Sequence, residues 1–250
     1  MDVVLFDLSL WQIIGIIIAA LLIGFSKTGI GGASMLAIPL IASIAGGKNS
    51  TGIMLLLLIA GDIFATLYYK KHTKWGNIFK IMPWNVVGLV LGTFVGNQIN
   101  DSQFKMLIAV SVLVCIVILV YGEVKRNNYT VPNKMWIYIL LGITCGFTSM
   151  IGNAAGPIFT VYMLALGFKK NDFMGTTAGF FFINNLIKVP LQVFVWGNIG
   201  GDTLLLTAQL LPAIVIGAVI GVVVLKKINE KAFRYIIIAM TVIAAVRLFF

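Results

Sequence analysis

Two glycine-rich breaks in otherwise apolar segments carry the side chains that could do chemistry in this chain. The first break spans residues 26–33, the second spans 148–156, and a new helical segment follows each of them. Helix starts leave unpaired N–H groups and the positive end of the helix dipole, and glycine lets a backbone approach a ligand closely. We expect Ser34 to cap the first of these helices and Pro157 to occupy the first turn of the second. Two such helix starts facing each other would form a cradle for an anion.

Polar groups in and beside these breaks would add hydrogen bonds to the anion. The substrate-binding residues expected from the sequence are Ser26, Lys27, Thr28, Gly29, Gly31, Gly32, Ser34, Thr148, Ser149, Gly152, Asn153, Gly156 and Lys188. An alternative is that the glycines only allow close helix packing, as small residues do in membranes. We adopt that alternative for Gly88, Gly92, Gly96, Gly217 and Gly221, which are spaced by four residues and so share a helix face. The glycines of the two breaks keep no helical spacing, which favours ligand binding.

Two charged side chains lie in the middle of apolar segments, Asp62 in 51–69 and Lys188 in 172–195. Charges inside membrane spans are costly and by default suggest function. We assign Asp62, Asn184 and Lys188 to ion coupling or ion pairing. Three interpretations remain open. Asp62 pairs with Lys188 as a structural contact, or Lys188 contacts the anion while Asp62 carries a coupling proton, or Lys188 extends to the membrane edge without a role.

The elements that must position these groups come in two copies. Trp-Gly-Asn-Ile at 75–78 returns at 196–199, an offset of 121 residues. Gly-Phe-Ser at 24–26 returns as Gly-Phe-Thr at 146–148, an offset of 122, and the same offset aligns Asp62 with Asn184. Further matches, at an offset of 129, join Gly88, Gly92 and Phe104 to Gly217, Gly221 and Phe233. Two apolar copies of roughly 115 residues are typical of a transporter built from internal repeats.

Composition excludes a soluble protein. The chain is 60% hydrophobic and 10% charged, whereas ordinary chains carry about 25% charged residues. The net charge of +10 is explained by the lysines and arginines that gather in cytoplasmic loops of membrane proteins, so we expect no nucleic-acid partner. With one histidine, two cysteines at no metal-like spacing and no phosphate-binding loop motif, we expect no metal, no cofactor and no ATP hydrolysis.

Charge also orders the segments across the membrane. Breaks in the apolar pattern leave ten segments, and alternating their loops puts fourteen of the eighteen basic residues on one side and three on the other. This bias predicts that the fourteen face the cytoplasm and that both termini lie outside. Five segments per copy is an odd number, so the second copy enters the membrane inverted. The fold class expected is an all-α polytopic membrane protein, with one repeat at 1–122, a cytoplasmic linker at 123–134 and an inverted repeat at 135–250.

Two of the ten segments are too short to cross the bilayer. At about 1.5 Å per residue, 34–45 and 157–167 reach only about 18 Å of a hydrocarbon core of roughly 30 Å. We therefore expect 9–45 and 135–167 to form broken, re-entrant helical hairpins that dip in from opposite faces. Their tips would meet near the middle of the bilayer, where Lys27 fits a water-filled cavity.

The two breaks also resemble a known family. GFSKTGIGGASMLAIP at 24–39, its weaker counterpart GFTSMIGNAAGP at 146–157, and the two-repeat layout resemble the sulfite exporter TauE/SafE family over nearly the whole chain. The resemblance implies a prokaryotic permease of the cytoplasmic (inner) membrane for small sulfur-containing or organic anions such as sulfite, sulfonates or thiosulfate. The second break departs from the family's glycine run at Asn153, Ala154 and Ala155, which leaves the substrate open.

The function expected from the sequence is a secondary transporter for a small anion that works by alternating access in the lipid bilayer, coupled to a proton or to sodium. A transporter or channel for a cation or an amino acid is the alternative. An intramembrane enzyme is disfavoured, because its base would have to be His72, which lies in a loop. A structural membrane subunit would not explain polar groups at equivalent positions in both copies. The sequence leaves the oligomeric state and the direction of transport open.

Overall fold

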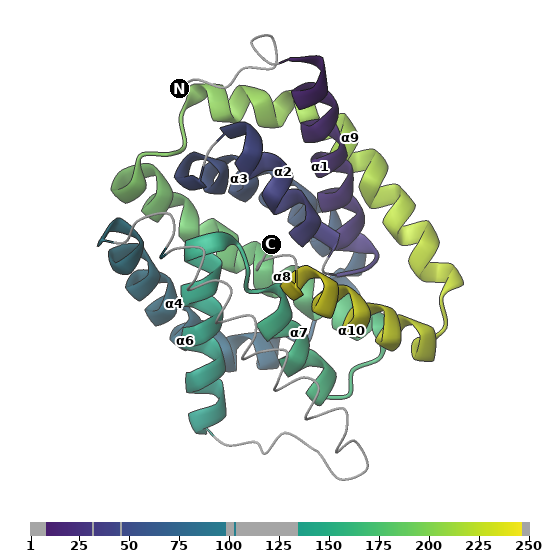
Figure 1. Ribbon diagram of the computed structural model, residues 1–250. Helices are drawn as coiled ribbons and strands as arrows, with labels where there is room; N and C mark the ends of the chain where they lie inside the picture. Colours follow the sequence, from purple (N-terminus) through teal and green to yellow (C-terminus); the bar gives the residue numbers. More distant parts are fainter. Residues whose placement is uncertain (1–8, 32, 46, 99–102, 104–134, 247–250) are drawn as a thin grey trace.

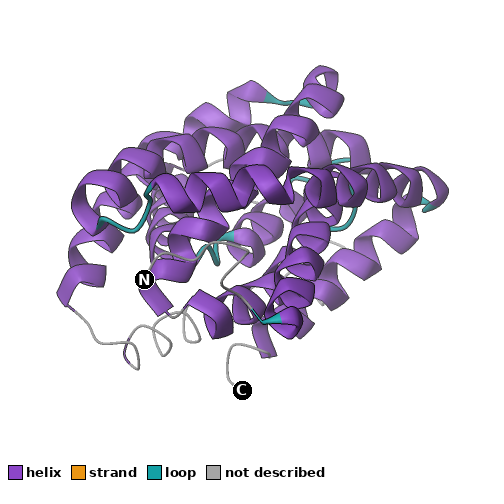
Figure 2. Cartoon of the chain, turned by 90° about the horizontal axis from the view of Figure 1, so that it is seen from above, coloured by secondary structure: helices purple, strands orange, loops and turns teal. Residues whose placement is uncertain are grey.

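The computed structural model describes residues 9–31, 33–45, 47–98, 103 and 135–246. Every regular element in these ranges is helical (Figure 2). The expected site residue Gly32, the linker at 123–134 and most of the fifth segment of the first repeat lie outside the described residues. The prediction of ten segments in two inverted repeats includes that fifth segment, and it stays a prediction.

The helices follow the order of the apolar segments (Figure 1). The first half contains α1 (Leu10–Thr28), the 3₁₀ helix η2 (Ala33–Leu36), α2 (Ala37–Ala45), α3 (Gly47–Tyr69), the 3₁₀ helix η3 (Lys70–His72) and α4 (Trp75–Gln98). The second half contains α6 (Met135–Gly152), α7 (Gly156–Ala165), α8 (Lys170–Pro190) with the π-helical turn η4 (Leu191–Trp196), α9 (Gly201–Lys227) and α10 (Glu230–Val246).

Six helices in the described part of the chain are long and apolar enough to cross a membrane: α1, α3, α4, α6, α8 and α9. Helices α2 and α7 have only 9 and 10 residues. At about 1.5 Å per residue, neither could cross a hydrocarbon core of roughly 30 Å on its own. Each of them follows a long helix that has been interrupted, which makes the interruptions the special feature of this fold.

Both interruptions fall within the ranges expected from the sequence, but they are built differently. Helix α1 ends at Thr28, where the N–H of Gly29 donates to the carbonyl oxygen of Phe25 at 2.8 Å. Helix α6 ends at Gly152, and Asn153 adopts a left-handed conformation with φ of 53°. Asparagine tolerates this region better than most residues, so it ends a helix as glycine often does.

The two expected helix starts have different outcomes. Pro157 does occupy the first turn of α7, where a residue without an N–H is tolerated. Ser34 does not cap a helix from outside, since it lies within η2, and its hydroxyl accepts a hydrogen bond from Ser26 at 3.2 Å. The prediction for Ser34 was wrong because the chain tightens into a 3₁₀ turn before α2 begins.

Two glycine seams join the halves of the molecule. Helix α1 packs along α9, and α6 packs along α4 (Figure 1). At four glycines a Cβ atom would overlap a backbone oxygen of the partner helix: Gly24 at Ile214, Gly217 at Leu21, Gly146 at Asn85 and Gly88 at Ile143. These contacts form two equivalent sets under the offsets of 122 and 129 residues. The packing role expected for Gly88 and Gly217 is therefore confirmed.

Helices α3 and α8 cross the centre of the molecule side by side and run antiparallel. Their contacts show this, because Asn198, just past η4, bonds to Thr51 near the start of α3, whereas Thr73, just past α3, bonds to Gly175 near the start of α8. Between these ends the side chains of Asp62, Asn184, Asn185 and Lys188 are almost completely buried. The polar centre of the fold thus lies midway along two long helices, beside both interruptions.

Candidate functional site

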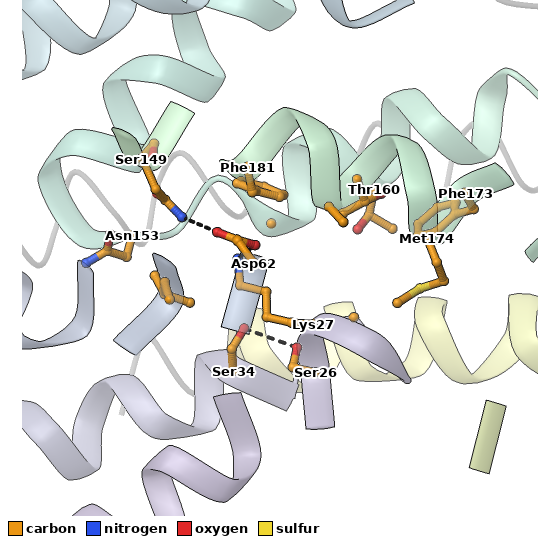
Figure 3. Close-up of a pocket in the computed structure, with 16 residues that line it drawn as sticks. Ser26, Lys27, Ser34, Asp62, Ser149, Asn153, Thr160, Phe173, Met174 and Phe181 are labelled. Carbon is orange, nitrogen blue, oxygen red and sulfur yellow. Dashed lines mark hydrogen bonds and ion pairs between the residues drawn. The ribbon is translucent and has the colours of Figure 1, made fainter. Parts of the chain in front are cut away.

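A cavity of about 60 Å³ lies between the two helix interruptions. Figure 3 shows Asp62 at this cavity, between the second interruption, marked by Ser149, and the first, marked by Ser34. The lining residues are Ser26, Lys27, Gly31, Ser34, Leu58, Asp62, Ser149, Asn153, Gly156, Thr160, Phe173, Met174, Thr177, Ala178, Phe181 and Asn185. Since a water molecule needs roughly 10–15 Å³ of such space, the cavity has room for a few waters or one small ion.

An ion pair between α1 and α3 forms one wall of the cavity. The ammonium of Lys27, at the end of α1, lies 2.7 Å from a carboxylate oxygen of Asp62 on α3. The other oxygen of Asp62 accepts a hydrogen bond of 2.7 Å from the side-chain amide of Asn185 on α8. Lys27 also lies 4.9 Å from the ring centroid of Phe181, close enough for a cation–π interaction. The carboxylate is therefore held from two helices.

The second lysine of the centre has no carboxylate partner in the described residues. The ammonium of Lys188 donates to the backbone carbonyl of Ser149 at 2.8 Å and to the side-chain oxygen of Asn153. Both acceptors lie at the carboxyl end of α6, where the helix dipole is negative, and the Ser149 carbonyl also accepts the N–H of Asn153 at 3.1 Å. This geometry stabilises a buried ammonium without a full negative charge beside it.

These contacts decide between the interpretations of Asp62 and Lys188. No ion pair joins the two side chains in the described structure, because Asp62 pairs with Lys27 instead. Lys188 does not extend to the membrane edge either, since none of its surface is exposed. The pairing and the edge interpretations were both wrong, because Asp62 finds its partner on α1 and Lys188 finds its partners at the carboxyl end of α6. The third interpretation placed the anion at Lys188, which does not line the cavity.

A chain of amides connects the two interruptions. Asn85 on α4 donates to Asn184 at 2.8 Å, and Asn184 donates to the Ser149 hydroxyl at 2.8 Å and to Asn185 at 3.2 Å. Asn185 in turn donates to Asp62. The sequence analysis did not select Asn85 or Asn185, although an asparagine in an apolar segment was the signal that could have found both.

The expected site residues separate into three groups. Ser26, Lys27, Gly31, Ser34, Ser149, Asn153 and Gly156 line the cavity, together with Asp62. Asn184 and Lys188 lie behind this wall and contact it through Ser149 and Asn153. Thr28, Gly29, Thr148 and Gly152 do not line it.

Helix packing explains most of the residues that do not line the cavity. The Thr28 hydroxyl donates to the carbonyl of Ala218 on α9 at 2.6 Å, and Gly29 lies against Gly221 of the same helix. The Thr148 hydroxyl donates to the carbonyl of Thr144 within its own helix at 2.8 Å. For these positions, proximity to a break in the sequence did not predict contact with the cavity. The different faces at the end of a helix contact different neighbours.

The sequence analysis missed one whole wall, which comes from α8. Phe173, Met174, Thr177, Ala178 and Phe181 face the cavity from this helix. Their spacing of three to four residues is that of one helix face. Nothing separated this face from the apolar faces that pack elsewhere, so only the tertiary structure identifies it.

The electrostatic balance of the centre is positive. Within the described residues, the centre holds two lysine side chains, Lys27 and Lys188, and one carboxylate, that of Asp62, which pairs with Lys27. Burying an uncompensated charge is unfavourable, and a negatively charged ligand would relieve it. No group of three or more histidine, cysteine or acidic residues that could hold a metal ion occurs in the described ranges. The groups that the centre presents are ammonium, hydroxyl and amide donors, which suit an anion.

Comparison with known proteins identifies the family. The family model described as Sulfite exporter TauE/SafE matches residues 16–248, which is nearly the whole chain. Neither a curated protein nor a solved structure gives a significant match. The chain belongs to the sulfite exporter TauE/SafE family and is accordingly a multi-pass membrane protein of a transporter family.

Proposed function

We propose that this chain is a secondary transporter that moves a small sulfur-containing or organic anion, such as sulfite, a sulfonate or thiosulfate, across the cytoplasmic membrane of a prokaryote. The observation that carries the proposal is the cavity between two interrupted helices, where two lysines, the largely buried Lys27 and the fully buried Lys188, outnumber the one buried carboxylate. Helix interruptions of this kind are where transporters built from repeats bind their substrates. Family membership supports an anion as the substrate.

The proposal includes two repeats that insert in opposite directions, at 1–122 and 135–250, joined by a cytoplasmic linker. Support comes from α3 and α8, which the repeat offset makes equivalent and which run antiparallel in contact. Equivalent helices related by an axis in the membrane plane must run antiparallel. The parallel arrangement found in transporters with repeats of the same orientation would not place them this way.

Alternating access would use the two glycine seams. Helix α1 of the first repeat packs on α9 of the second, and α6 of the second packs on α4 of the first. Each repeat thus contributes one helix to each seam, and the glycines keep the backbones in close contact. We propose that one repeat rocks against the other along these smooth seams while the central site stays between them.

The cavity extends from the centre of the molecule toward one end of α8. Along α8 its lining runs from Asn185 to Phe173, toward the end of the helix that begins at Lys170. The same end of the molecule carries Lys70 and Lys71. Since basic residues gather on the cytoplasmic side, we propose that the conformation described has its site directed toward the cytoplasm, with both termini outside.

A transporter or channel for a cation or an amino acid fits the site less well. A cation would have to displace the Lys27 ammonium from the carboxylate of Asp62 and lie near the second ammonium, that of Lys188. An enzyme would need a nucleophile beside a base, and His72 instead contacts Asp172 at 3.2 Å, outside the cavity. Coupling of the anion to a proton or to sodium is part of the proposal.

Binding measured on the reconstituted protein tests the proposal. The full chain in proteoliposomes would be heated with sulfite, thiosulfate, methanesulfonate, sodium, choline or amino acids while its unfolding is followed. We expect a small anion to raise the midpoint of unfolding, because a ligand stabilises the state that binds it, and radiolabelled sulfite or thiosulfate to enter the vesicles.

Two variants make the result specific. Lys27→Ala should abolish both effects of the anion, whereas Lys227→Ala, at an exposed lysine at the end of α9, should keep them. Stabilisation by a cation or an amino acid instead of any anion would contradict the proposed substrate class. Failure of every solute to stabilise the wild-type chain or to enter the vesicles would contradict the transporter itself.

A further inference from the structure

The carboxylate of Asp62 occupies the place in the cavity where a bound anion would be expected. It takes the Lys27 ammonium on one oxygen at 2.7 Å and the Asn185 amide on the other at 2.7 Å. Both donors line the cavity together with Asp62. An ammonium paired with one oxygen and an amide donating to the other is the set of contacts that a small oxyanion would itself require.

Lys27 is the lysine that an entering anion can reach. Its side chain is 11% exposed and lines the cavity. Lys188 is completely buried, does not line the cavity, and gives hydrogen bonds to two acceptors at the carboxyl end of α6. The two lysines look alike in the sequence, but they differ in their access to the cavity and in the partners that hold their ammonium groups.

The charged groups around Asp62 are few. Helix α1 contributes Lys27 and α8 contributes Lys188. Helix α2 carries no charged residue, and the charged residues of α9 lie only at its ends, at Asp202, Lys226 and Lys227. With both lysines protonated and Asp62 ionised, the centre carries two positive charges and one negative charge, a net charge of plus one.

We propose, building on the function proposed above, that Asp62 is an internal counter-anion that the transported anion replaces at Lys27 as the carboxylate takes up a proton. One proton then enters with each univalent anion. The proton comes from bulk solution through the cavity, delivered as a hydronium ion that leaves as neutral water, and bonds to a carboxylate oxygen of Asp62. The contact with Lys27 opens, and the ammonium pairs with the incoming anion.

The charge of the centre explains why the two events are linked. The empty centre has a net charge of plus one, from two ammonium groups and one carboxylate. With Asp62 protonated and a univalent anion bound, the count is again two positive charges and one negative, so the net charge is unchanged. Either event alone would alter the charge of a buried site, which low-dielectric surroundings make expensive. Anion and proton therefore favour each other's binding, as reciprocal linkage requires.

Counting protons during anion binding tests this inference on the wild-type chain. Methanesulfonate is a suitable probe, because its own charge does not change between neutral and mildly acidic pH. Its binding to the detergent-purified full chain would be measured by calorimetry in two buffers with different heats of ionisation. We expect an uptake approaching one proton per bound anion. The affinity should weaken by up to about tenfold per pH unit above the pH at which the carboxylate titrates.

A matched pair of variants adds a second readout. Asp62→Asn keeps the shape but loses both the charge and the proton site, so it should bind methanesulfonate without proton uptake and with an affinity independent of pH. Asp202→Asn, which removes a carboxylate in the first turn of α9, should behave like the wild type. If Asp62→Asn does not fold, the number of protons taken up by the wild type still tests whether anion binding requires a proton.

The outcomes separate the inference from the function on which it rests. Methanesulfonate binding without proton uptake by the wild type would overturn the exchange at Lys27 and leave an anion transporter standing. Proton uptake that persists in Asp62→Asn would assign the proton to another group and overturn the role of Asp62. No binding of methanesulfonate, sulfite or thiosulfate at any pH would overturn the proposed function as well.

Discussion

The two helix interruptions occupy equivalent positions in the sequence repeat, but they differ in where their charged side chain comes from. At the first, Lys27 forms an ion pair with Asp62 at the cavity. At the second, the position equivalent to Lys27 under the offset of 122 is Ser149, and a lysine from α8, Lys188, bonds to its backbone carbonyl. One break thus carries its own charge, whereas the other receives one from a neighbouring helix.

This difference shows how a repeated fold can hold an asymmetric site. The seams that position the breaks are the same in both halves, down to the glycines that contact the partner backbone. The positions equivalent to Asp62 and Lys188 hold Asn184 and Thr66, so each charge occurs in one copy only. The repeat determines where the groups lie, and individual substitutions determine what they bind.

The largest expected effect comes from removing the charge of the first break. Lys27→Ala leaves the carboxylate of Asp62 buried without a cation, and we expect the free energy of unfolding to fall by about 3–5 kcal/mol and anion binding to be lost. Chemical denaturation and transport into proteoliposomes would measure the two effects.

A double variant separates these two consequences. Lys27→Met combined with Asp62→Asn removes both charges, so stability should return to within about 1 kcal/mol of wild type, since replacing a buried pair with neutral groups is often neutral. Anion transport should stay absent. Recovery of transport in the double variant would show that Lys27 serves the structure alone.

Substitutions in the two glycine seams should reduce stability by similar amounts in both halves, unlike substitutions at the two breaks. Gly24→Ala and Gly146→Ala each push a methyl group into a backbone oxygen of the partner helix. We expect each to lower the free energy of unfolding by about 1–3 kcal/mol, as measured by denaturation.

A glycine outside the seams serves as the control. A Cβ atom at Gly76 would contact nothing within 4 Å, so Gly76→Ala should not destabilise the protein. A large effect at only one of the two seams would contradict their equivalence.

The second lysine should matter less for binding than the first. Lys188→Met leaves the Ser149 carbonyl and the Asn153 side chain without their buried donor, at a cost of about 1–3 kcal/mol in stability. Anion binding should weaken but persist, because Lys27 still lines the cavity. Calorimetry with methanesulfonate would show it, and complete loss of binding comparable to that of Lys27→Ala would reverse our ranking of the two lysines.

The smallest structural change would make the second break resemble the first. Asn153→Asp gives Lys188 a carboxylate partner and retains a residue that tolerates the left-handed backbone. We expect stability within about 1 kcal/mol of wild type and weaker anion binding, because the net positive charge of the centre is removed. Unchanged affinity in the same calorimetric titration would show that the net charge does not govern binding.

The sequence predicted much of the scaffold. Internal matches located both breaks, and apolar length identified the long helices and the short ones that follow each break. These features depend on local composition and on the periodicity of a single helix, which a linear pattern carries directly. The family motif at 24–39 was recognised for the same reason, since its residues are consecutive.

The site was predicted only in part, and the errors have one cause. Asp62 lies in the centre, and only one of three open interpretations gave it an ion-pair partner, Lys188 on α8, whereas its partner is Lys27 on α1. Thr28 and Gly29 adjoin Lys27 in sequence, yet they face α9 instead of the cavity. Which side of a helix end faces a ligand depends on how that helix is rotated against its neighbours.

By itself, the sequence determined that this chain is an apolar, twice-repeated helical protein with two interruptions and a few isolated charges. Those properties follow from the solvent that each segment can tolerate and from the backbone freedom of glycine, both of which act locally. Only the tertiary structure decided which charges meet. An ion pair joins residues 35 positions apart through the packing of α1 and α3, and an ammonium finds a helix end only when that end is brought to it.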